Sequence, residues 1–503
     1  MSFFDEMESK IPRGGVRTRF APSPTGYMHV GGLRTALYSY LIAKKSAGTF
    51  ILRIEDTDSA RFVEGATEII IDTLKDAGLN FDEGPGIGGP VSPYVQSERK
   101  HLYRPYAELL CEKGAAYYCF CEAREQGSGD RGQGNESACG LIEIDDDPCR
   151  NLPYDEAKRR VDAGESFAIR MKAPREGSTT VEDMIFGSIT AQNATLDDMV
   201  LLKSDGMPTY NFANVIDDHL MGITHVLRGS EYISSAPKYN LLYSAFGWEI
   251  PAYITVSPVM RDERHKLSKR DGDPTYDDLL RQGYLPGAIL NYVALLGWSP
   301  GGEREIFALP EILEVFDVGG ISKSPAIFDI EKLNYFNREY MRQLAPEEFE
   351  EMARPYIRQA VKNESLPIGA IASILQTRCD KLSDIPEKID FLDEAPEYPA
   401  ELYVHKKSKT DERISLEMLR AARDALEKLH IWTDEALHDA FAALAERIGA
   451  KNATLLWPVR IAVSGKAVTP GGAVEICGIL GREETLRRID AGIEKLKGFD
   501  ADE

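Results

Sequence analysis

Cysteine is scarce in this sequence, and long apolar runs do not occur. The 503 residues include seven cysteines, an odd number at irregular spacing that excludes a disulfide framework and fits reduced thiols in the cytosol. No apolar run approaches the roughly 18 to 20 residues that span a bilayer, and the acidic start MSFFDEMESK lacks the basic-then-apolar pattern of a signal peptide. We therefore expect a cytoplasmic protein without a membrane partner.

Positive charge is also in short supply. Lys and Arg number 59 against 81 Asp and Glu, which gives a formal net charge of -22 and argues against indiscriminate binding of polyanions. A selective RNA partner is still compatible with this charge, because affinity depends on the basic residues of one face, while the acidic remainder repels wrong partners. Composition alone favours an enzyme acting on small molecules, in a chain long enough for about three or four domains.

The start of the chain has the pattern of an α/β unit. Residues 16–21 alternate like a strand, prolines and a glycine in 22–26 break it, and apolar residues in 33–45 recur at helical spacing before a second apolar strand at 50–54. Doubly wound parallel sheets begin in this way, and they bind ligands at the carboxyl ends of their strands.

The residue pattern of the later chain changes more than once. From 122 to 148 it is glycine-rich and acidic, which predicts a surface excursion inside an inserted domain. The α/β texture returns near Val200, and beyond about Phe328 helical faces dominate, including one that stops at Gly449. The C-terminal third is therefore predicted to be all-helical.

The stretch RFAPSPTGYMHVGG, residues 19–32, joins the first predicted strand to the first predicted helix. Glycines at such a junction let a nucleotide approach the backbone, and the amino terminus of the helix offers N-H groups to phosphate. His29 in this turn could donate to phosphate oxygens as negative charge builds up in a transition state. An isolated HxGG turn is more often purely structural, so a second motif is needed to decide.

A second motif lies far downstream. HKLSKRDG, residues 265–272, carries Lys266 and Lys269 on either side of a serine, and mobile ammonium groups suit the triphosphate of ATP. Alone, such a run is usually a solvated cluster of surface charge. An HxGG turn in the first α/β unit combined with a KLSKR loop much later in the chain resembles the class I aminoacyl-tRNA synthetases.

The residues around these motifs indicate the branch. APSPTGYMHVGGLRTALY and LRIEDTD (52–58) resemble glutamyl-tRNA synthetases of bacterial type, whereas glutaminyl enzymes and the archaeal glutamyl branch usually carry a PPEPNG-like start and a second histidine; this chain has Gly32. Further matches in family order are PTYNFANVIDDH, THVLRGSEYISS, LNYVALLGWSP and SPAIFDIEKLNYFNREYM. The resemblance runs from about Arg17 to the C-terminal end. A truncated paralogue that glutamylates a modified tRNA base lacks the helical half that this chain retains.

The resemblance implies a polar pocket for L-glutamate. Guanidinium forks suit its two carboxylates, and a carboxylate suits its ammonium group. By similarity, Arg19, Tyr210, Asn214 and Arg228 bind the carboxylate ends, Ser23 and Glu55 lie near the amino group, and Thr57, Asp58 and Arg61 meet the acceptor end of the tRNA. Glutamine would leave a buried arginine unpaired, at a cost on the order of several kcal/mol that makes hydrolytic editing unnecessary.

The resemblance also implies an ATP-dependent ligase reaction in two steps, with Mg²⁺ bound to the ATP. The α-carboxylate of glutamate attacks the α-phosphorus to give glutamyl-adenylate and pyrophosphate, and the terminal ribose of the tRNA then takes the glutamyl group. His29, Lys266 and Lys269 are the implied catalytic and phosphate-binding residues, and Gly31 makes room for the nucleotide. Neither a protein nucleophile nor a general base is needed, because positioning and charge stabilisation suffice.

The helical C-terminal part is expected to read the anticodon, since single-stranded bases are recognised by stacking and by hydrogen bonds to their edges. YVHKKSKTDER, residues 403–413, mixes an aromatic, a histidine and basic residues, although a solvated loop is the favoured interpretation. Arg460 and Lys466 are either RNA contacts or surface charges, and the sequence leaves both open. The partner is tRNA(Glu), whether tRNA(Gln) is also charged stays open, and a monomer is expected.

Three cysteines bear on a metal site. Cys119, Cys121 and Cys149 match the position in the inserted domain where some family members bind structural zinc with a fourth ligand two residues further on. That position is Asn151 here, a poor zinc ligand, and the alternative Cys139 lies in the glycine-rich excursion. The sequence therefore favours an insertion without zinc.

The predicted architecture is multidomain, with a Rossmann-like α/β catalytic domain of class I type, an inserted α+β acceptor-binding domain and C-terminal all-α anticodon-binding domains. The predicted segments are 14–118 and 200–255 for the catalytic domain, 119–199 for the insertion, 256–330 for a stem-contact region with the KLSKR loop, and 331–503 for the helical part. One rival is a small nucleotidylyltransferase, which would not need the helical residues at the end. The other is an inactive RNA-binding paralogue, which should have lost at least one of the motif residues.

Overall fold

A computed structural model provides the coordinates of the protein. No helix in the described stretches is long and apolar enough to cross a membrane. Four residues named above, Asp58, Arg61, Cys139 and Lys269, lie outside the described residues. The described residues are 2–57, 63–121, 147–267 and 272–499.

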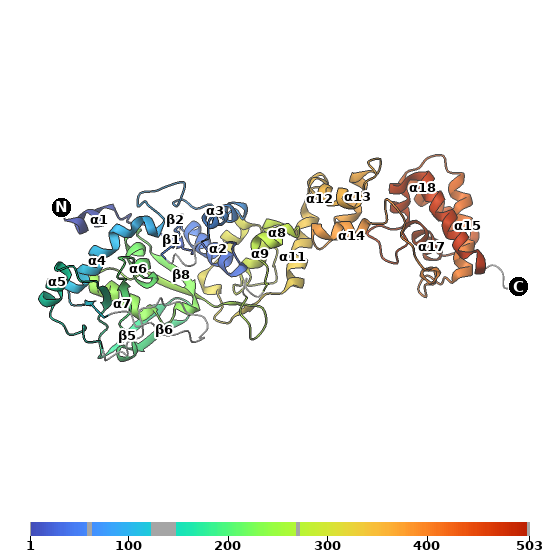
Figure 1. The fold of residues 1–503 in the computed structure, drawn as a ribbon. Helices are drawn as coiled ribbons and strands as arrows, with labels where there is room; N and C mark the ends of the chain where they lie inside the picture. The colour runs from blue at the N-terminus through green and yellow to red at the C-terminus, as the bar shows by residue number, and fades with distance from the viewer. Residues whose placement is uncertain (1, 58–62, 122–146, 268–271, 500–503) are drawn as a thin grey trace. The chain divides into compact units, whose positions relative to one another are not determined.

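The chain forms two compact units (Figure 1). The first contains Met1–Leu279 and Ile289–Asp329, and the second contains Leu280–Ala288 and Ile330–Glu503. The second unit therefore takes a short piece of chain from within the stretch that otherwise builds the first. The domain boundaries drawn from the sequence remain predictions, because these units are defined by packing and not by catalytic role.

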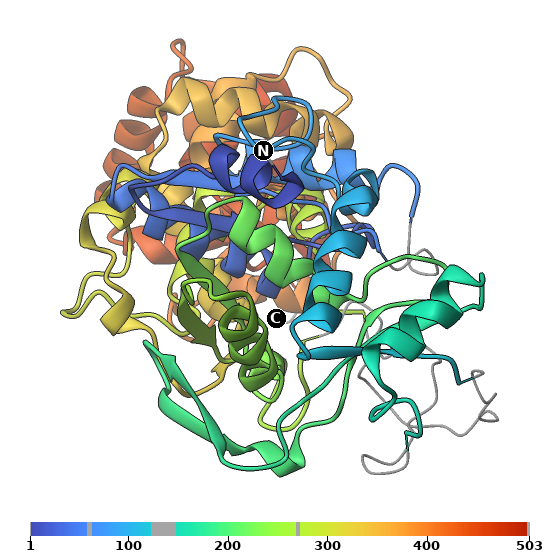
Figure 2. The same cartoon turned by 90° about the vertical axis from the view of Figure 1, so that its left-hand side faces the viewer.

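A six-stranded sheet forms the centre of the first unit. Its strand order is β2-β1-β8-β9-β5-β6, and neighbouring strands run parallel except for the antiparallel hairpin of β5 and β6 at one edge (Figure 2). This mainly parallel sheet confirms the predicted α/β catalytic fold. The strands are β1 Arg17–Phe20, β2 Thr49–Leu52, β5 Ser178–Asp183, β6 Gly187–Gln192, β8 His225–Gly229 and β9 Ala252–Val256.

Helix α2, Val30–Lys45, packs on β1, β2 and β8. It begins at His29, whose side chain caps the first turn, and its last turn carries Lys44 and Lys45, where cations interact favourably with the helix dipole. The chain then passes Gly48 on its way to β2. A Cβ on Gly48 would lie 2.1 Å from the carbonyl oxygen of Val16, so only glycine fits there.

The other long helices of the first unit lie around this sheet in Figures 1 and 2. Helix α1 packs on α6, and α7 packs on β5. The position of α6 matters most for the site, because it carries several of its polar residues. The helices are α1 Phe3–Lys10, α3 Ala66–Asp76, α4 Lys100–Glu112, α6 Tyr210–Leu220 and α7 Ala236–Phe246.

A second, smaller sheet is built from the chain between α4 and α6. It is antiparallel, with strand order β3-β4-β7, and helix α5 lies between β3 and β4 in the sequence. This is the mixed α and β texture expected for the insertion. The elements are β3 Ala116–Cys119, α5 Tyr154–Asp162, β4 Ala168–Met171 and β7 Val200–Leu202.

The chain after β9 carries short elements. Strands β10 and β11 pair in parallel over two residues each. In sequence, β10 precedes the KLSKR motif and β11 follows it. The elements are β10 Val259–Met260, α8 Tyr276–Arg281, α9 Pro286–Ala294, α10 Leu309–Val315 and β11 Ala326–Ile327.

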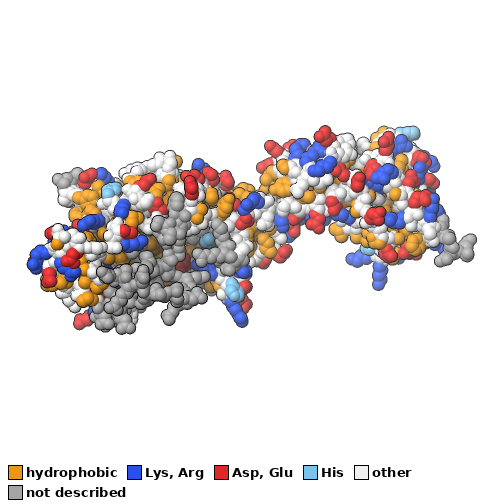
Figure 3. All heavy atoms as spheres, viewed as in Figure 1, with side chains coloured by type: hydrophobic (Ala, Val, Ile, Leu, Met, Phe, Trp, Pro, Cys, Tyr) orange, Lys and Arg blue, Asp and Glu red, His pale blue; other side chains and the backbone are white. Residues whose placement is uncertain are grey.

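The second unit is built of helices, as predicted for the C-terminal third. In α16, Leu437, Phe441 and Leu444 are buried on one face, and the helix ends at Gly449 with a φ of 66°, a left-handed cap that glycine adopts without strain. Acidic and basic side chains are interspersed over the face drawn in Figure 3. The helices are α11 Ile330–Gln343, α12 Pro346–Ala360, α13 Ile368–Leu375, α14 Ile385–Ile389, α15 Glu412–Glu427, α16 Asp434–Ile448, α17 Asn452–Ser464 and α18 Ala473–Leu496.

Candidate functional site

Three of the predicted glutamate-binding residues lie at the carboxyl ends of adjacent parallel strands. Arg19 is on β1, Glu55 follows β2, and Arg228 is on β8. Because β1 pairs with both β2 and β8, the three residues meet at one edge of the sheet, which is where open α/β folds bind ligands. All three side chains are buried.

Asp218 of α6 connects the charged residues of this site. Its carboxylate accepts hydrogen bonds from Arg19 Nε at 2.9 Å and Nη2 at 3.3 Å, and from Arg53 Nη1 at 2.7 Å. Arg53 is fully buried and also donates from Nη2 to Glu55 Oε1 at 2.8 Å. Four buried charges of alternating sign therefore hold one another in place, and charge-assisted hydrogen bonds of this kind fix the planes of both guanidiniums.

Burial and charge act against each other on the two carboxylates. Burial raises the pKa of Glu55 above its ordinary value, and the Arg53 guanidinium offsets only part of that rise. Burial acts in the same direction on Asp218, but the guanidiniums of Arg19 and Arg53 outweigh it and hold the pKa of Asp218 below its ordinary value. Asp218 is therefore an anion at neutral pH.

Arg228 lies among tyrosine rings and has hydrogen-bonding capacity to spare. Its guanidinium carbon lies 4.8 Å from the ring centre of Tyr239, 5.7 Å from that of Tyr232 and 5.8 Å from that of Tyr253. The Asp218 carboxylate is 3.8 Å from its Nη2. Nε and Nη1 are buried and have no hydrogen-bond partner among the described residues. A buried donor left without a partner costs about 1–3 kcal/mol, which a bound carboxylate would recover.

Asn214 and Tyr210 lie in the first half of α6. The Asn214 amide nitrogen donates to the Tyr210 carbonyl at 2.8 Å, and its side-chain oxygen is buried without a partner in the described part of the chain. An amide oxygen accepts from N-H donors, so in this orientation it suits an ammonium group. The Tyr210 ring lies 5.4 Å from the Tyr232 ring, which joins these residues to the tyrosines around Arg228.

His29 caps α2 with its ring held in one orientation. Its Nδ1 accepts from the Gly32 amide at 3.2 Å, so the neutral imidazole carries its proton on Nε2. That nitrogen is the donor that a phosphate contact requires. A Cβ on Gly31 would lie 3.0 Å from Cε1 of the same ring, so a larger residue there would press against the imidazole.

Backbone hydrogen bonds bring the two sequence motifs together. The Tyr276 amide donates to the Met28 carbonyl at 3.0 Å, and Thr275 forms a β-bridge with His29. The chain directly after the KLSKR motif is thus tied to the turn that carries His29. Two motifs far apart in the sequence therefore share one region of the first unit.

Lys266 lies on a short hairpin that returns to β10, where it forms a bridge with Met260. The turn before it is fixed by Asp262, whose Oδ1 accepts from the amides of Arg264 and His265 at 2.8 and 2.9 Å. These hydrogen bonds lower the pKa of Asp262 to about 2. The Lys266 ammonium is half-exposed and lies 3.9 Å from Glu231.

Sequence reasoning does not single out Arg53 or Asp218. Asp218 stands in the mostly polar segment NVIDDH and has no signal of its own, whereas a signal exists for Arg53, because it interrupts the apolar strand-like run FILRI. A charge in such a place is buried with a partner or is functional. Of the remaining predicted residues, Ser23 is exposed in the loop after β1 and Thr57 is buried after Glu55, and their roles remain predictions.

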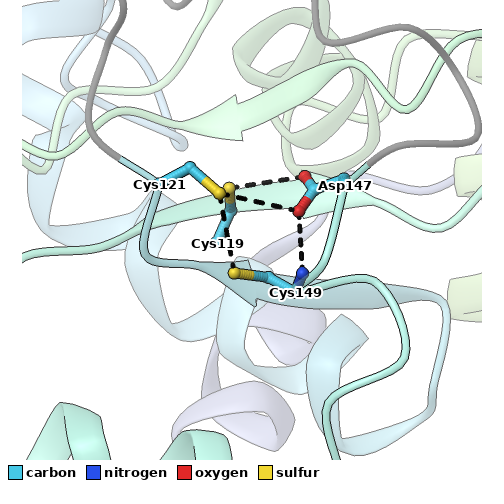
Figure 4. Close-up of side chains that lie close together, drawn as sticks. All are labelled: Cys119, Cys121, Asp147 and Cys149. Carbon is cyan, nitrogen blue, oxygen red and sulfur yellow. Dashed lines mark hydrogen bonds between the residues drawn. The ribbon is translucent and has the colours of Figure 1, made fainter.

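Cys119, Cys121 and Cys149 converge with Asp147 in the insertion (Figure 4). One ligand atom from each of the four lies within 4.8 Å of every other. Asn151, the predicted fourth position, is exposed, and the fourth donor in the structure is Asp147, two residues before Cys149 instead of two after it. Three thiols and a carboxylate are a donor set that fits Zn²⁺.

An aromatic stack in the second unit lies on the predicted RNA-contact segments. The His405 ring stacks on Trp457 with centres 3.8 Å apart, and the Arg460 guanidinium carbon is 4.6 Å from the Trp457 ring centre. Arg460 Nε is buried with no partner within the described stretches. Lys466, by contrast, pairs with Asp390 at 2.6 Å.

Two family models match this chain. The model described as tRNA synthetases class I (E and Q), catalytic domain, matches residues 15–335. The model described as anticodon binding domain matches residues 348–493. The two matches follow each other along the sequence and leave only short stretches uncovered.

Similar full-length proteins are known. The glutamate-tRNA ligase of Clostridium tetani is 56% identical over 482 residues, which is 96% of this chain and 98% of the relative, and that of Clostridium acetobutylicum is 52% identical over 482 residues, 96% and 99% respectively. A crystal structure of a glutamate tRNA ligase from Elizabethkingia meningosepticum in complex with its amino acid has a TM-score of 0.83 at 34% identity, covering 96% of this chain and 100% of that one.

Proposed function

This chain belongs to the class I tRNA synthetases of the glutamate and glutamine type, and on that premise we propose how its residues join glutamate to tRNA. The protein is a glutamate-tRNA ligase. The α-carboxylate of glutamate attacks the α-phosphorus of ATP and expels pyrophosphate, which gives glutamyl-adenylate. A hydroxyl of the 3' terminal ribose of tRNA(Glu) then attacks the activated carbonyl and expels AMP. Mg²⁺ accompanies the ATP.

The unused donors of Arg228 carry the proposal for the glutamate pocket. Arg228 binds the side-chain carboxylate through Nε and Nη1, which have no partner among the described residues. The negative charges of Asp218 and Glu55 neutralise the positive charges of Arg19 and Arg53. Arg228 therefore gives this set of five side chains a net charge of one positive unit. A glutamate side chain supplies the missing negative charge, and a neutral glutamine amide does not.

The rest of the substrate is held by the groups around this arginine. Glu55 accepts from the α-ammonium, with Ser23 close by. Asn214, which the resemblance places at the carboxylate ends, is assigned instead to the α-ammonium, because its amide nitrogen already donates to Tyr210 and its side-chain oxygen has no partner among the described residues. Tyr210 and Arg19 border the carboxylate ends. Tyrosine rings around the guanidinium exclude water, and this strengthens charge pairing in the pocket.

The phosphate groups of ATP are bound between the two motifs. His29 donates from Nε2, and Lys266 and Lys269 neutralise charge on the triphosphate. Backbone pairing between Thr275–Tyr276 and Met28–His29 keeps the lysine motif close to the capped helix end. Positioning and electrostatic stabilisation together are sufficient for this phosphoryl chemistry.

The tRNA is contacted at its acceptor end and at an unpaired base. Thr57, Asp58 and Arg61 meet the acceptor end. In the second unit, Arg460, His405 and Trp457 form a stacking platform for an unpaired base, because aromatic and guanidinium planes bind bases in this way. The exposed Lys406 and Lys407 beside it contact phosphate. The protein acts as a cytoplasmic monomer. The assay below decides whether tRNA(Gln) is a second substrate.

Acylation with labelled glutamate tests the proposal. Purified tRNA(Glu) and tRNA(Gln) are incubated with the full chain and ATP, and Arg228→Lys is assayed beside it. Lysine keeps the charge but has no fork, so two charge-assisted hydrogen bonds worth about 1.5–3 kcal/mol each are lost or weakened, and kcat/KM for glutamate falls by roughly 10²- to 10⁴-fold.

Arg104→Lys, an exposed arginine on α4 paired with Glu108, is the matched control and should retain full activity. Charging of tRNA(Glu) alone indicates a discriminating enzyme, and charging of both tRNAs indicates a non-discriminating one. A variant Arg228→Lys with unchanged kcat/KM would remove Arg228 from the pocket, and charging of neither tRNA would refute the activity.

A further inference from the structure

A cavity in the first unit serves no step of the ligase reaction. It is lined by residues of β5, of helix α7, which packs on β5 (Figure 1), and of the start of β9. Its volume of about 440 Å³ lies in the range of pockets that bind small molecules. Among its lining residues, Tyr253 also borders the glutamate pocket, where its ring centre is 5.8 Å from the Arg228 guanidinium carbon.

Three residues of this cavity each carry a buried polar atom without a hydrogen-bond partner in the described part of the chain. The atoms are Asp183 Oδ2, Asn240 Oδ1 and the Tyr253 hydroxyl oxygen. The three residues are 5%, 6% and 3% exposed, respectively. Buried polar groups in folded proteins are nearly always paired, so three unpaired ones around one cavity indicate that a molecule inside it supplies the partners.

The Asp183 carboxylate is held with one oxygen free. Its Oδ1 accepts from the amides of Ile185 and Phe186, each at 2.8 Å, and these hydrogen bonds fix the plane of the carboxylate. Asp183 pairs with Tyr253 in the register of β5 and β9, so both side chains leave the sheet on the same face. Oδ2 is therefore an acceptor that is oriented before any ligand arrives.

Asn240 of α7 also presents an oxygen. Its Nδ2 donates to the Thr180 carbonyl at 3.1 Å, and the opposite orientation of the amide would set two oxygens against each other. The free Oδ1 accepts and cannot donate. A carboxylate oxygen and an amide oxygen together favour a ligand that donates hydrogen bonds and carries positive charge.

The chemistry of the cavity fits an organic cation better than a metal ion. Ca²⁺ takes about six to eight oxygen ligands, whereas an ammonium group needs only a few acceptors. The rest of the wall is largely apolar and includes Met184, Ile250 and Pro251, of which Met184 and Ile250 are exposed large apolar side chains. A chain of methylene groups is stabilised by such a wall, and a carboxylate ligand such as glutamate is repelled by Asp183.

We propose that this cavity binds an ammonium group carried on an apolar chain. Asp183 and Asn240 accept from the ammonium together with the Tyr253 hydroxyl, and Met184 and Ile250 cover the chain. Two sources share this chemistry, a free alkylamine and the side chain of a lysine in a peptide. The site does not depend on the assignments in the glutamate pocket, and its test does not use glutamylation.

Calorimetric titration of the full chain with pentylamine tests the proposal. Pentylamine should bind with a Kd below about 1 mM, and pentanol, which has the same chain without the charge, should bind at least about 10-fold more weakly. N-acetyl-lysine amide separates the two sources, because its binding shows that a lysine in a peptide enters the site, whereas binding of pentylamine alone assigns the site to free amines. No binding of pentylamine at about 10 mM would mean that water fills the cavity and would overturn the proposal.

Two matched variants test the role of Asp183. Asp183→Asn keeps the acceptor for the two amides but places an N-H donor where Oδ2 lies, so pentylamine binding should weaken by at least about 10-fold. Glu182→Gln removes the same charge from an exposed side chain of the same cavity, whose Oε2 already accepts from the Ser188 hydroxyl at 2.6 Å, and should weaken binding by less than about 3-fold. Equal losses in the two variants would show general charge attraction only and would overturn the site.

A third variant keeps the test decisive if Asp183→Asn does not fold, which thermal unfolding shows. Ile250→Ser changes an exposed residue and removes part of the apolar wall. It should retain the melting temperature of the natural chain and weaken pentylamine binding by about 3-fold or more. Unchanged affinity in Ile250→Ser would place the amine outside this cavity and would overturn the proposal.

Discussion

Asp218 is a single carboxylate shared by two buried arginines, and replacing it tests how the pocket is held. Asp218→Asn keeps the shape of the side chain but leaves Arg19 and Arg53 with one anion fewer. Removing one partner of a buried ion pair costs about 3–5 kcal/mol, and the guanidiniums lose their fixed positions. We expect a lower melting temperature and, in the folded fraction, a higher KM for glutamate.

Glu108→Gln is the matched control at this scale, because it removes an exposed i,i+4 pair with Arg104 that is worth at most about 1 kcal/mol. Thermal unfolding by calorimetry and glutamate titrations on both variants give the comparison. Equal melting temperatures for the two variants would show that Asp218 does not organise the buried charges.

At the level of residues, motifs lead from the sequence to Arg19, Glu55 and Arg228, which the structure brings to one sheet edge. They do not lead to the pairing of Arg53 with Asp218, which are 165 positions apart and meet only because α6 lies beside the end of β2. Asp147 is missed for a related reason. Its neighbourhood is acidic (IDDDPC), so nothing local distinguishes the one carboxylate that turns toward the thiols.

At the level of elements, helix α17 offers a test of RNA contact. Arg460→Gln keeps a polar side chain over Trp457 but removes the charge, and the loss of one base or phosphate contact costs about 1–3 kcal/mol. We expect KM for tRNA(Glu) to rise roughly 5- to 150-fold, while KM for ATP stays unchanged. Steady-state acylation at varied tRNA and ATP concentrations measures both.

Arg447→Gln on the neighbouring helix α16 removes an exposed arginine and serves as its control. An equal rise of the tRNA KM in both variants would mean that Arg460 contributes only general charge. No rise in Arg460→Gln would leave the stack of His405 on Trp457 as a purely structural feature.

Elements with a local signal were predictable. Helices α2 and α16 follow from apolar spacing and, for α16, from the glycine at its end. The pairing of β10 with β11 was not, because two residues per strand show no periodicity and their partners are remote in sequence. The tie between the chain after the lysine motif and the turn at His29 is likewise a property of the folded molecule.

For the whole molecule, a net charge of -22 and a polyanionic substrate predict that salt strongly weakens tRNA binding but has little effect on glutamate binding. Contacts between basic side chains and phosphate release counterions, so raising salt from about 50 to 200 mM should weaken tRNA binding by at least about 10-fold. Glutamate meets charges that are buried and screened much less, so its KM should change by less than about 3-fold. Acylation kinetics at several KCl concentrations provide both values.

Magnesium is held constant in that titration so that the RNA keeps its fold, and potassium acetate replaces KCl as the check on anion effects. Parallel changes in the two KM values would contradict the separation of an exposed RNA surface from a buried amino acid pocket.

The sequence does not predict which residues belong to which unit. The apolar residues Leu285 and Ala288 belong to the core of the second unit, but in sequence they look like their neighbours in the first unit.

Residues 280–288 also affect the order in which the protein can be completed on the ribosome. They are synthesised before 289–329, yet they pack with helices that begin at Ile330, and Gly283 accepts from the amide of Leu382. All residues of the first unit are therefore synthesised before the helices that pack with residues 280–288. A gene fragment beginning at Ile330 would encode the helices without that segment, so neither unit corresponds to one uninterrupted reading frame.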